Sequence, residues 1–139
     1  MRQNLTLITF GAADVEKSAQ FYESLGWKRS DKGTDDFILF ELGGILFSLY
    51  PREALAKDMG IENAGPAFGG MAVSYNAESE AEVDEVFALA LKNGATSVKA
   101  PEKVFWGGYS GYIQDLDGHY IEIAYNPFWK LDKDGKVVL

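Results

Sequence analysis

The chain has 139 residues and a mass of 15.3 kDa, with no cysteine, one histidine and a formal net charge of −8. This length predicts one compact unit, and the 47% hydrophobic content excludes global disorder. The missing cysteine excludes disulfides and thiol chemistry, and the acidic balance speaks against a nucleic-acid partner. No apolar run approaches the ~20 residues of a membrane helix, and the N-terminal residues lack a signal-peptide pattern. We therefore expect no membrane association and a cytoplasmic protein.

The first half of the chain predicts a strand, a helix and a hairpin. A β-rich run covers residues 5–10. Asp14 can cap a helix that starts at Val15 and ends at Gly26. A weaker strand is expected near residues 27–30. Apolar runs at 37–42 and 45–50 flank Gly43-Gly44, which is a two-residue hairpin signal.

The second half predicts the same order of elements. A strand at 71–76 precedes a helix that begins at Ser79, where Glu82 has the spacing of a capping box, and that ends at Asn93-Gly94. A weaker strand is expected at 96–99. Strands at 111–115 and 119–125 are joined by a tight turn over residues 116–118.

This order makes the chain an internal repeat. Strand, helix, short strand and hairpin occupy about residues 4–51 and again about 70–127. The residues between, about 52–69, are rich in Gly, Ala and Pro and predict a linker with one helical turn. Residues 128–139 form a C-terminal tail, and residues 1–139 together are expected to make one domain.

Two stretches carry a resemblance to a known family. They are AADVEKSAQFYESLGW in the first module and FWGGYSGYIQDLDGHYIEIAYNPFW in the second. Both resemble the vicinal oxygen chelate superfamily, which includes glyoxalases, bleomycin-resistance proteins and extradiol dioxygenases. The resemblance implies an α+β fold in which two tandem βαβββ modules form a curved, cup-shaped mixed sheet with the helices outside. It also implies a homodimer, whose modules pair within the chain or across the dimer.

The resemblance further implies one divalent metal on four strand positions of the family. In this chain those positions fall at Leu7, at Ala72 or Met71, at Leu46 or Ser48, and at Glu122. Only Glu122 supplies a good metal ligand, whereas such sites need several. We therefore predict no cofactor and no metal site, with a divalent metal as the alternative.

The single histidine does not restore that site. His119 and Glu122 are three residues apart, so on a strand they point to opposite faces. The DGH turn favours a structural role for His119, and Asp115 and Asp117 are expected to form the turn. Glu122 is then either a general base in an apolar-walled cavity or a partner in hydrogen bonds.

Aromatic residues crowd the last third of the chain, and they suit a cavity that binds planar or apolar ligands. A few polar groups with the right strand parity would orient such a ligand. The candidate ligand-binding residues are Ser48, Tyr50, Ser74, Asn76, Trp106 and Tyr120.

Two functions follow. The first is binding of a small organic molecule in the cup without a metal, in the manner of bleomycin-resistance proteins. The alternative is an enzyme, a glyoxalase-like lyase or a dioxygenase, that uses a divalent metal or Glu122 as general base. The sequence leaves open whether the protein is an enzyme.

Overall fold

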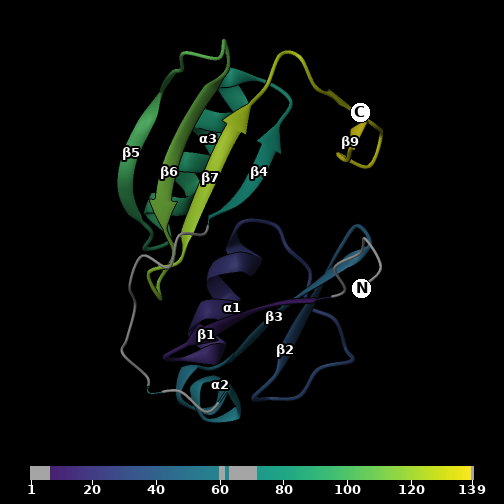
Figure 1. Cartoon of the computed structure of the whole chain (residues 1–139), viewed down its shortest axis with the longest axis vertical. Coiled ribbons are helices and arrows are strands. Elements are labelled where there is room, and N and C mark those ends of the chain that lie inside the picture. Colours follow the sequence, from purple (N-terminus) through teal and green to yellow (C-terminus); the bar gives the residue numbers. More distant parts are fainter. Residues whose placement is uncertain (1–6, 60–61, 63–71, 139) are drawn as a thin grey trace. The chain divides into compact units, whose positions relative to one another are not determined.

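The computed structural model describes residues 7–59, 62 and 72–138. The chain divides into two compact units, Met1–Ala67 and Phe68–Leu139. Each unit is an α+β structure built on its own open mixed sheet, and each is described by itself (Figure 1).

The first unit carries a three-stranded sheet in the order β1-β3-β2. Its elements are β1 (Leu7–Ala12), α1 (Val15–Ser24), β2 (Ile38–Leu42), β3 (Ile45–Pro51) and α2 (Arg52–Met59). β1 runs parallel to β3, and β2 pairs with β3 as an antiparallel hairpin. The predicted hairpin around Gly43-Gly44 is confirmed, and both glycines adopt the positive φ that this turn requires.

An aromatic cluster forms the core of the first unit. Phe47 of β3 is 2% exposed, and its ring lies 4.9 Å from Phe10, 5.1 Å from Tyr22 and 5.2 Å from Trp27 between centroids. Tyr22 brings α1 into this cluster, and Phe40 completes it from β2. The helix therefore packs on the sheet through large rings.

The second unit carries a four-stranded sheet in the order β4-β7-β6-β5. Its elements are β4 (Val73–Ala77), α3 (Glu80–Lys92), β5 (Thr96–Lys103), β6 (Tyr109–Gln114) and β7 (Tyr120–Tyr125). β4 and β7 are parallel, and β6 is antiparallel to both of its neighbours. A two-stranded pair, β8 (Lys130–Leu131) and β9 (Val137–Val138), lies within the predicted tail.

Both predicted helix starts are confirmed. The Asp14 carboxylate accepts a hydrogen bond from the Lys17 backbone N–H at 3.0 Å, and the Ser79 hydroxyl accepts one from Glu82 N–H at 3.1 Å. Glu82 accepts the Glu78 backbone N–H at 2.7 Å, one residue earlier than a capping box requires.

Two elements differ from the prediction. Residues 27–30 form no strand and make only one isolated bridge, between Arg29 and Phe40. The polar run that follows, from Asp31 to Asp36, turns the chain back before a ladder can extend. The segment expected to hold one helical turn contains the eight-residue α2, and the predicted strand position Met71 lies outside the described residues.

Candidate functional site

The second sheet has two faces, and hydrogen bonds identify the one that α3 covers. The Tyr75 hydroxyl donates to Glu82 and the Tyr109 hydroxyl to Asp84, both on α3. Tyr75 is paired with Ile123, and residues paired across strands project from the same face. Glu122 therefore projects from the opposite face, which we call the open face.

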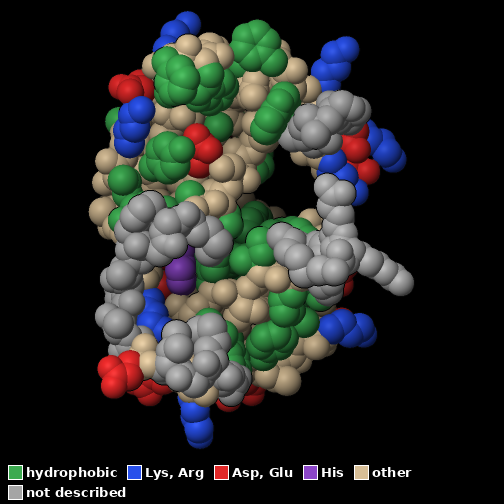
Figure 2. All heavy atoms as spheres, viewed as in Figure 1, with side chains coloured by type: hydrophobic (Ala, Val, Ile, Leu, Met, Phe, Trp, Pro, Cys, Tyr) green, Lys and Arg blue, Asp and Glu red, His purple; other side chains and the backbone are tan. Residues whose placement is uncertain are grey.

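The open face is mostly polar. Its members on β4, β7 and β6 are Ser74, Asn76, Ser110, Tyr112, Gln114, Tyr120, Glu122 and Ala124. Figure 1 draws α3 behind these strands, so that Figure 2 looks onto the open face. There an acidic side chain lies among hydrophobic ones over β6 and β7. A sheet face of this composition suits a ligand better than an apolar core.

Glu122 lies at the centre of this face and is half-buried. The Ser74 hydroxyl on β4 donates to its Oε2 at 2.8 Å. Tyr112, on the other neighbouring strand, is paired directly with Glu122 and projects from the same face. Burial, followed by interaction with the Glu122 carboxylate, raises the pKa of Tyr112.

One ion pair lies on β5, at the edge of the open face. Lys99 of β5 is paired with Tyr112, and its Nζ lies 2.8 Å from Glu102 Oε1. That ion pair leaves Glu122 as the uncompensated charge among the members of this face.

The first unit contains the corresponding pair of positions. Thr9 lies five residues before the cap Asp14, and Ser74 lies five residues before the cap Ser79. Across the strands, Thr9 is paired with Ser48 in the same way as Ser74 is paired with Glu122. The Ser48 hydroxyl donates to Thr9 Oγ1 at 2.8 Å and is fully buried. Ser48, rather than Leu46, is thus the counterpart of Glu122.

The remaining predicted ligand-binding residues fall into both units. Tyr50 makes an edge contact with Phe37, with 5.7 Å between ring centroids. Asn76 Nδ2 donates to the neighbouring Ala77 carbonyl at 3.4 Å. The Trp106 ring packs so closely on Gly108 that a Cβ there would lie 1.8 Å from it. Tyr120 stands opposite Gln114. The structure therefore joins Ser74 to Glu122 and gives Tyr50, Asn76 and Trp106 other neighbours.

Sequence reasoning missed Tyr112 and the role of Thr9. Tyr112 was recognisable once the turn over residues 116–118 fixed the hairpin register, because that register places it opposite Glu122. Thr9 has the strand parity of Leu7, so its face was predictable but its bond to Ser48 was not.

His119 takes part in the turn of the β6–β7 hairpin. Its Nδ1 lies 2.9 Å from Asp115 Oδ2. The other oxygen of Asp115 accepts the backbone N–H groups of Asp117 at 2.9 Å and His119 at 2.8 Å. The Asp115 side chain is 1% exposed. This buried carboxylate organises the turn, which is the structural arrangement expected for the DGH sequence.

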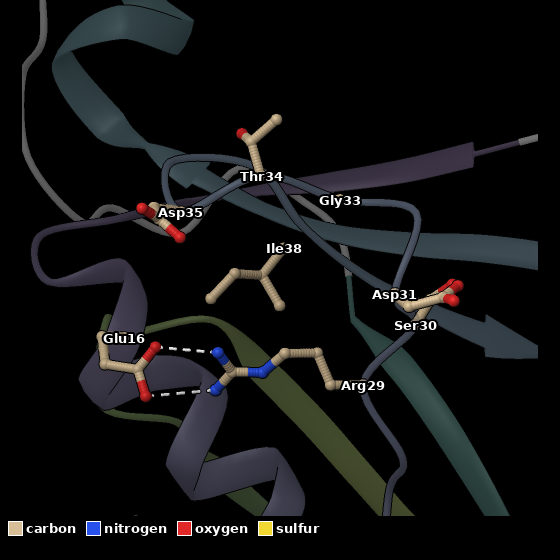
Figure 3. Close-up of a pocket in the computed structure, with 8 residues that line it drawn as sticks. All are labelled: Glu16, Arg29, Ser30, Asp31, Gly33, Thr34, Asp35 and Ile38. Carbon is tan, nitrogen blue, oxygen red and sulfur yellow. Dashed lines mark hydrogen bonds and ion pairs between the residues drawn. The ribbon is translucent and has the colours of Figure 1, made fainter.

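A pocket of about 290 Å³ lies elsewhere, in the first unit beside α1 (Figure 3). Its lining residues are Glu16, Arg29, Ser30, Asp31, Gly33, Thr34, Asp35 and Ile38. The Arg29 guanidinium donates to Glu16 at 2.8 and 3.2 Å and to Glu23 at 3.0 and 3.2 Å. Arg29 therefore anchors its segment to α1, and the pocket contains none of the predicted site residues.

The comparison with protein families matches residues 5–123 to the model described as the Glyoxalase/Bleomycin resistance protein/Dioxygenase superfamily. The chain belongs to this superfamily. A glyoxalase-related enzyme from Fulvimarina pelagi is 31% identical with a TM-score of 0.89, and the match covers 99% of this chain and 98% of that one. No curated protein matches the chain.

Other solved structures share the glyoxalase fold. A hypothetical protein from S. aureus is 25% identical with a TM-score of 0.77, and the match covers 91% of this chain and 95% of that one. The lactoylglutathione lyase from Agrobacterium tumefaciens is 20% identical with a TM-score of 0.68, with 95% and 100% covered. At that identity the lyase shows the fold alone.

The donor set at the metal positions of the glyoxalase superfamily does not fit a divalent transition metal. With Ser48 identified as the counterpart of Glu122, the four positions that the resemblance implies hold Leu7, Ser48, Glu122 and Ala72 or Met71, of which Met71 lies outside the described residues. One carboxylate and one neutral hydroxyl fall short of the several nitrogen, sulfur or carboxylate ligands that such ions require. Among residues 7–59, 62 and 72–138, no group of three or more His, Asp or Glu is arranged to hold a metal ion.

Proposed function

We propose that this glyoxalase-superfamily protein binds a small organic molecule on the open face of its second sheet, without a metal. The bonding of Glu122 carries the proposal. In this chain the carboxylate at the position where the resemblance implies a metal ligand accepts the Ser74 hydroxyl at 2.8 Å and stands directly across from Tyr112.

The surroundings of Glu122 support ligand binding. Tyr112 and Tyr120 provide half-buried aromatic surface, and Ser74 and Asn76 provide polar groups at the open face. Aromatic walls with few fixed polar groups are typical of small-molecule sites. Ser48, Tyr50 and Trp106 remain predicted ligand-binding residues. The homodimer and the cytoplasmic location also remain predictions.

A metal-free ligand screen tests the proposal. Thermal shift with a diverse small-molecule library, run in EDTA, should give compounds that raise Tm. The shift should shrink in Ser74→Ala and in Glu122→Gln, and stay unchanged in Glu85→Gln, which removes an exposed carboxylate of α3. Compounds whose effect needs an added divalent ion, or is insensitive to both open-face variants, would contradict it.

The alternative is an enzyme with Glu122 as general base. The name of the Fulvimarina pelagi relative as an enzyme favours it, and Glu122 is a half-buried carboxylate that stands across from Tyr112. Mass spectrometry of each stabilising compound after incubation separates the two functions. A product that forms with the original protein and not with Glu122→Gln would establish the enzyme.

A further inference from the structure

We infer that the ligand presents a positively charged nitrogen to Glu122, as an organic ammonium ion on an aromatic or other apolar body. This inference rests on the proposed function, because it assumes that the open face is the binding site. It names the chemical class that the face recognises.

The first argument is the direction of the hydrogen bonds. The Ser74 hydroxyl donates its proton to Glu122. A hydroxyl has one proton, so Ser74 has only acceptor lone pairs left to offer. A carboxylate has about four acceptor sites, and this bond leaves about three of them open. The cluster therefore offers acceptors, and its ligand must donate.

The second argument is charge. Within the part of the chain that the structure describes, the Glu122 carboxylate accepts the neutral Ser74 hydroxyl, and Lys99, which shares its face, is ion-paired with Glu102. A carboxylate or phosphate ligand would meet Glu122 without a free cation to offset it, and like charges repel strongly in a half-buried site. An ammonium ion supplies the missing charge together with three donors.

The third argument is the aromatic setting. Tyr112 stands directly across from Glu122, and Tyr120 precedes it by two residues on the same face of β7. Tyrosine rings attract cations and also cover apolar ligand surface. A carboxylate flanked by two tyrosines therefore favours an ammonium ion with an apolar body over a hydrated inorganic cation.

Three probes that share a phenyl ring on a two-carbon chain test the inference. They are 2-phenylethylammonium, 3-phenylpropionate and neutral 2-phenylethanol, titrated in EDTA and followed by NMR shifts of the protein. We expect 2-phenylethylammonium to bind with a Kd at least about tenfold below that of the other two. The preference should vanish in Glu122→Gln. It should persist in Ser74→Ala, which keeps the carboxylate, and in Glu85→Gln.

The outcomes separate this inference from the proposed function. Equal or tighter binding of 3-phenylpropionate, or an ammonium preference that survives Glu122→Gln, overturns the inference. Failure of 2-phenylethylammonium to bind at millimolar concentration, while the library yields Glu122-dependent compounds, overturns the inference alone. If no compound binds through Glu122, both fall.

Discussion

At the scale of single residues, the contact between Tyr112 and Glu122 has a measurable consequence. Burial is the largest cause of the raised pKa of Tyr112, and interaction with the Glu122 carboxylate comes next. Replacing the carboxylate with a neutral amide removes the charge that opposes phenolate formation. We therefore predict that Glu122→Gln lowers the pKa of Tyr112 toward its ordinary value.

Tyrosinate absorbance during an alkaline titration measures this change. The titration of Tyr112→Phe is subtracted from that of the original protein, and the titration of the double variant Glu122→Gln/Tyr112→Phe is subtracted from that of Glu122→Gln. Each difference isolates Tyr112 from the six other tyrosines. A Tyr112 pKa that does not move in Glu122→Gln would mean that the two side chains do not interact in solution.

The aromatic core gives a second prediction at this scale. Phe47 is 2% exposed among Phe10, Tyr22 and Trp27. Phe47→Ala should lower the free energy of unfolding by about 3–5 kcal/mol, measured by urea denaturation, because the substitution leaves a cavity. Phe105, whose side chain is fully exposed, supplies the control. Phe105→Ala should change stability by less than about 0.5 kcal/mol, and equal losses would contradict the assignment of the core.

At the scale of elements, the helix starts were predictable because a cap is a local interaction. Asp14 and Ser79 each accept a backbone N–H within three residues. We predict that Asp14→Ala and Ser79→Ala each cost about 1 kcal/mol of unfolding free energy. Asp14→Asn and Ser79→Asp, which retain a capping oxygen, are the controls. Loss of the same stability in the controls would show that the caps are not the cause.

The stability that the hydrogen bond between Tyr75 of β4 and Glu82 of α3 contributes depends on pH. Burial and the Glu82 contact raise the pKa of Tyr75 from its ordinary value of 10.0 to about 12. The folded state thus holds this proton more tightly than the unfolded state. The resulting stability is fully present below about pH 10 and is lost as the pH rises toward 12.

A comparison with Tyr75→Phe measures how this stability contribution changes with pH. The difference in unfolding free energy between the original protein and Tyr75→Phe should shrink as the pH rises from about 10 to 12. Tyr75 is 43% exposed, so solvent weakens the effect. A difference that is constant over this range would contradict the bond to Glu82.

Elements set by non-local contacts were harder to predict than caps and turns. In the first unit, Arg29 bonds to Glu16 and Glu23 of α1, and its segment makes a single bridge in place of the strand that its counterpart β5 forms. At the candidate site, strand parity placed Ser74 and Glu122 on one face correctly. The bond from Ser74 to Glu122 was not predictable from parity, because it depends on the β4–β7 register between residues 48 positions apart.

At the scale of the whole molecule, the repeat and two motifs were sufficient to predict the superfamily, but the fold does not determine what the protein does. The four positions at which the resemblance implies a metal hold Leu7, Ser48, Glu122 and Ala72 or Met71. No described helix is long and apolar enough to cross a bilayer. We propose that this superfamily member uses Glu122 as a hydrogen-bonding carboxylate, without a metal.

The metal content of the purified protein distinguishes a metal-free Glu122 from a metal ligand. Tag-free protein is dialysed against zinc, nickel, manganese or ferrous iron, then against buffer, and its metal is measured by plasma mass spectrometry. Glu122→Ala and Glu85→Ala are treated in the same way. We predict no stoichiometric metal in the original protein and no difference among the three. One ion per chain that is retained by the original protein and by Glu85→Ala, and lost in Glu122→Ala, would contradict the account.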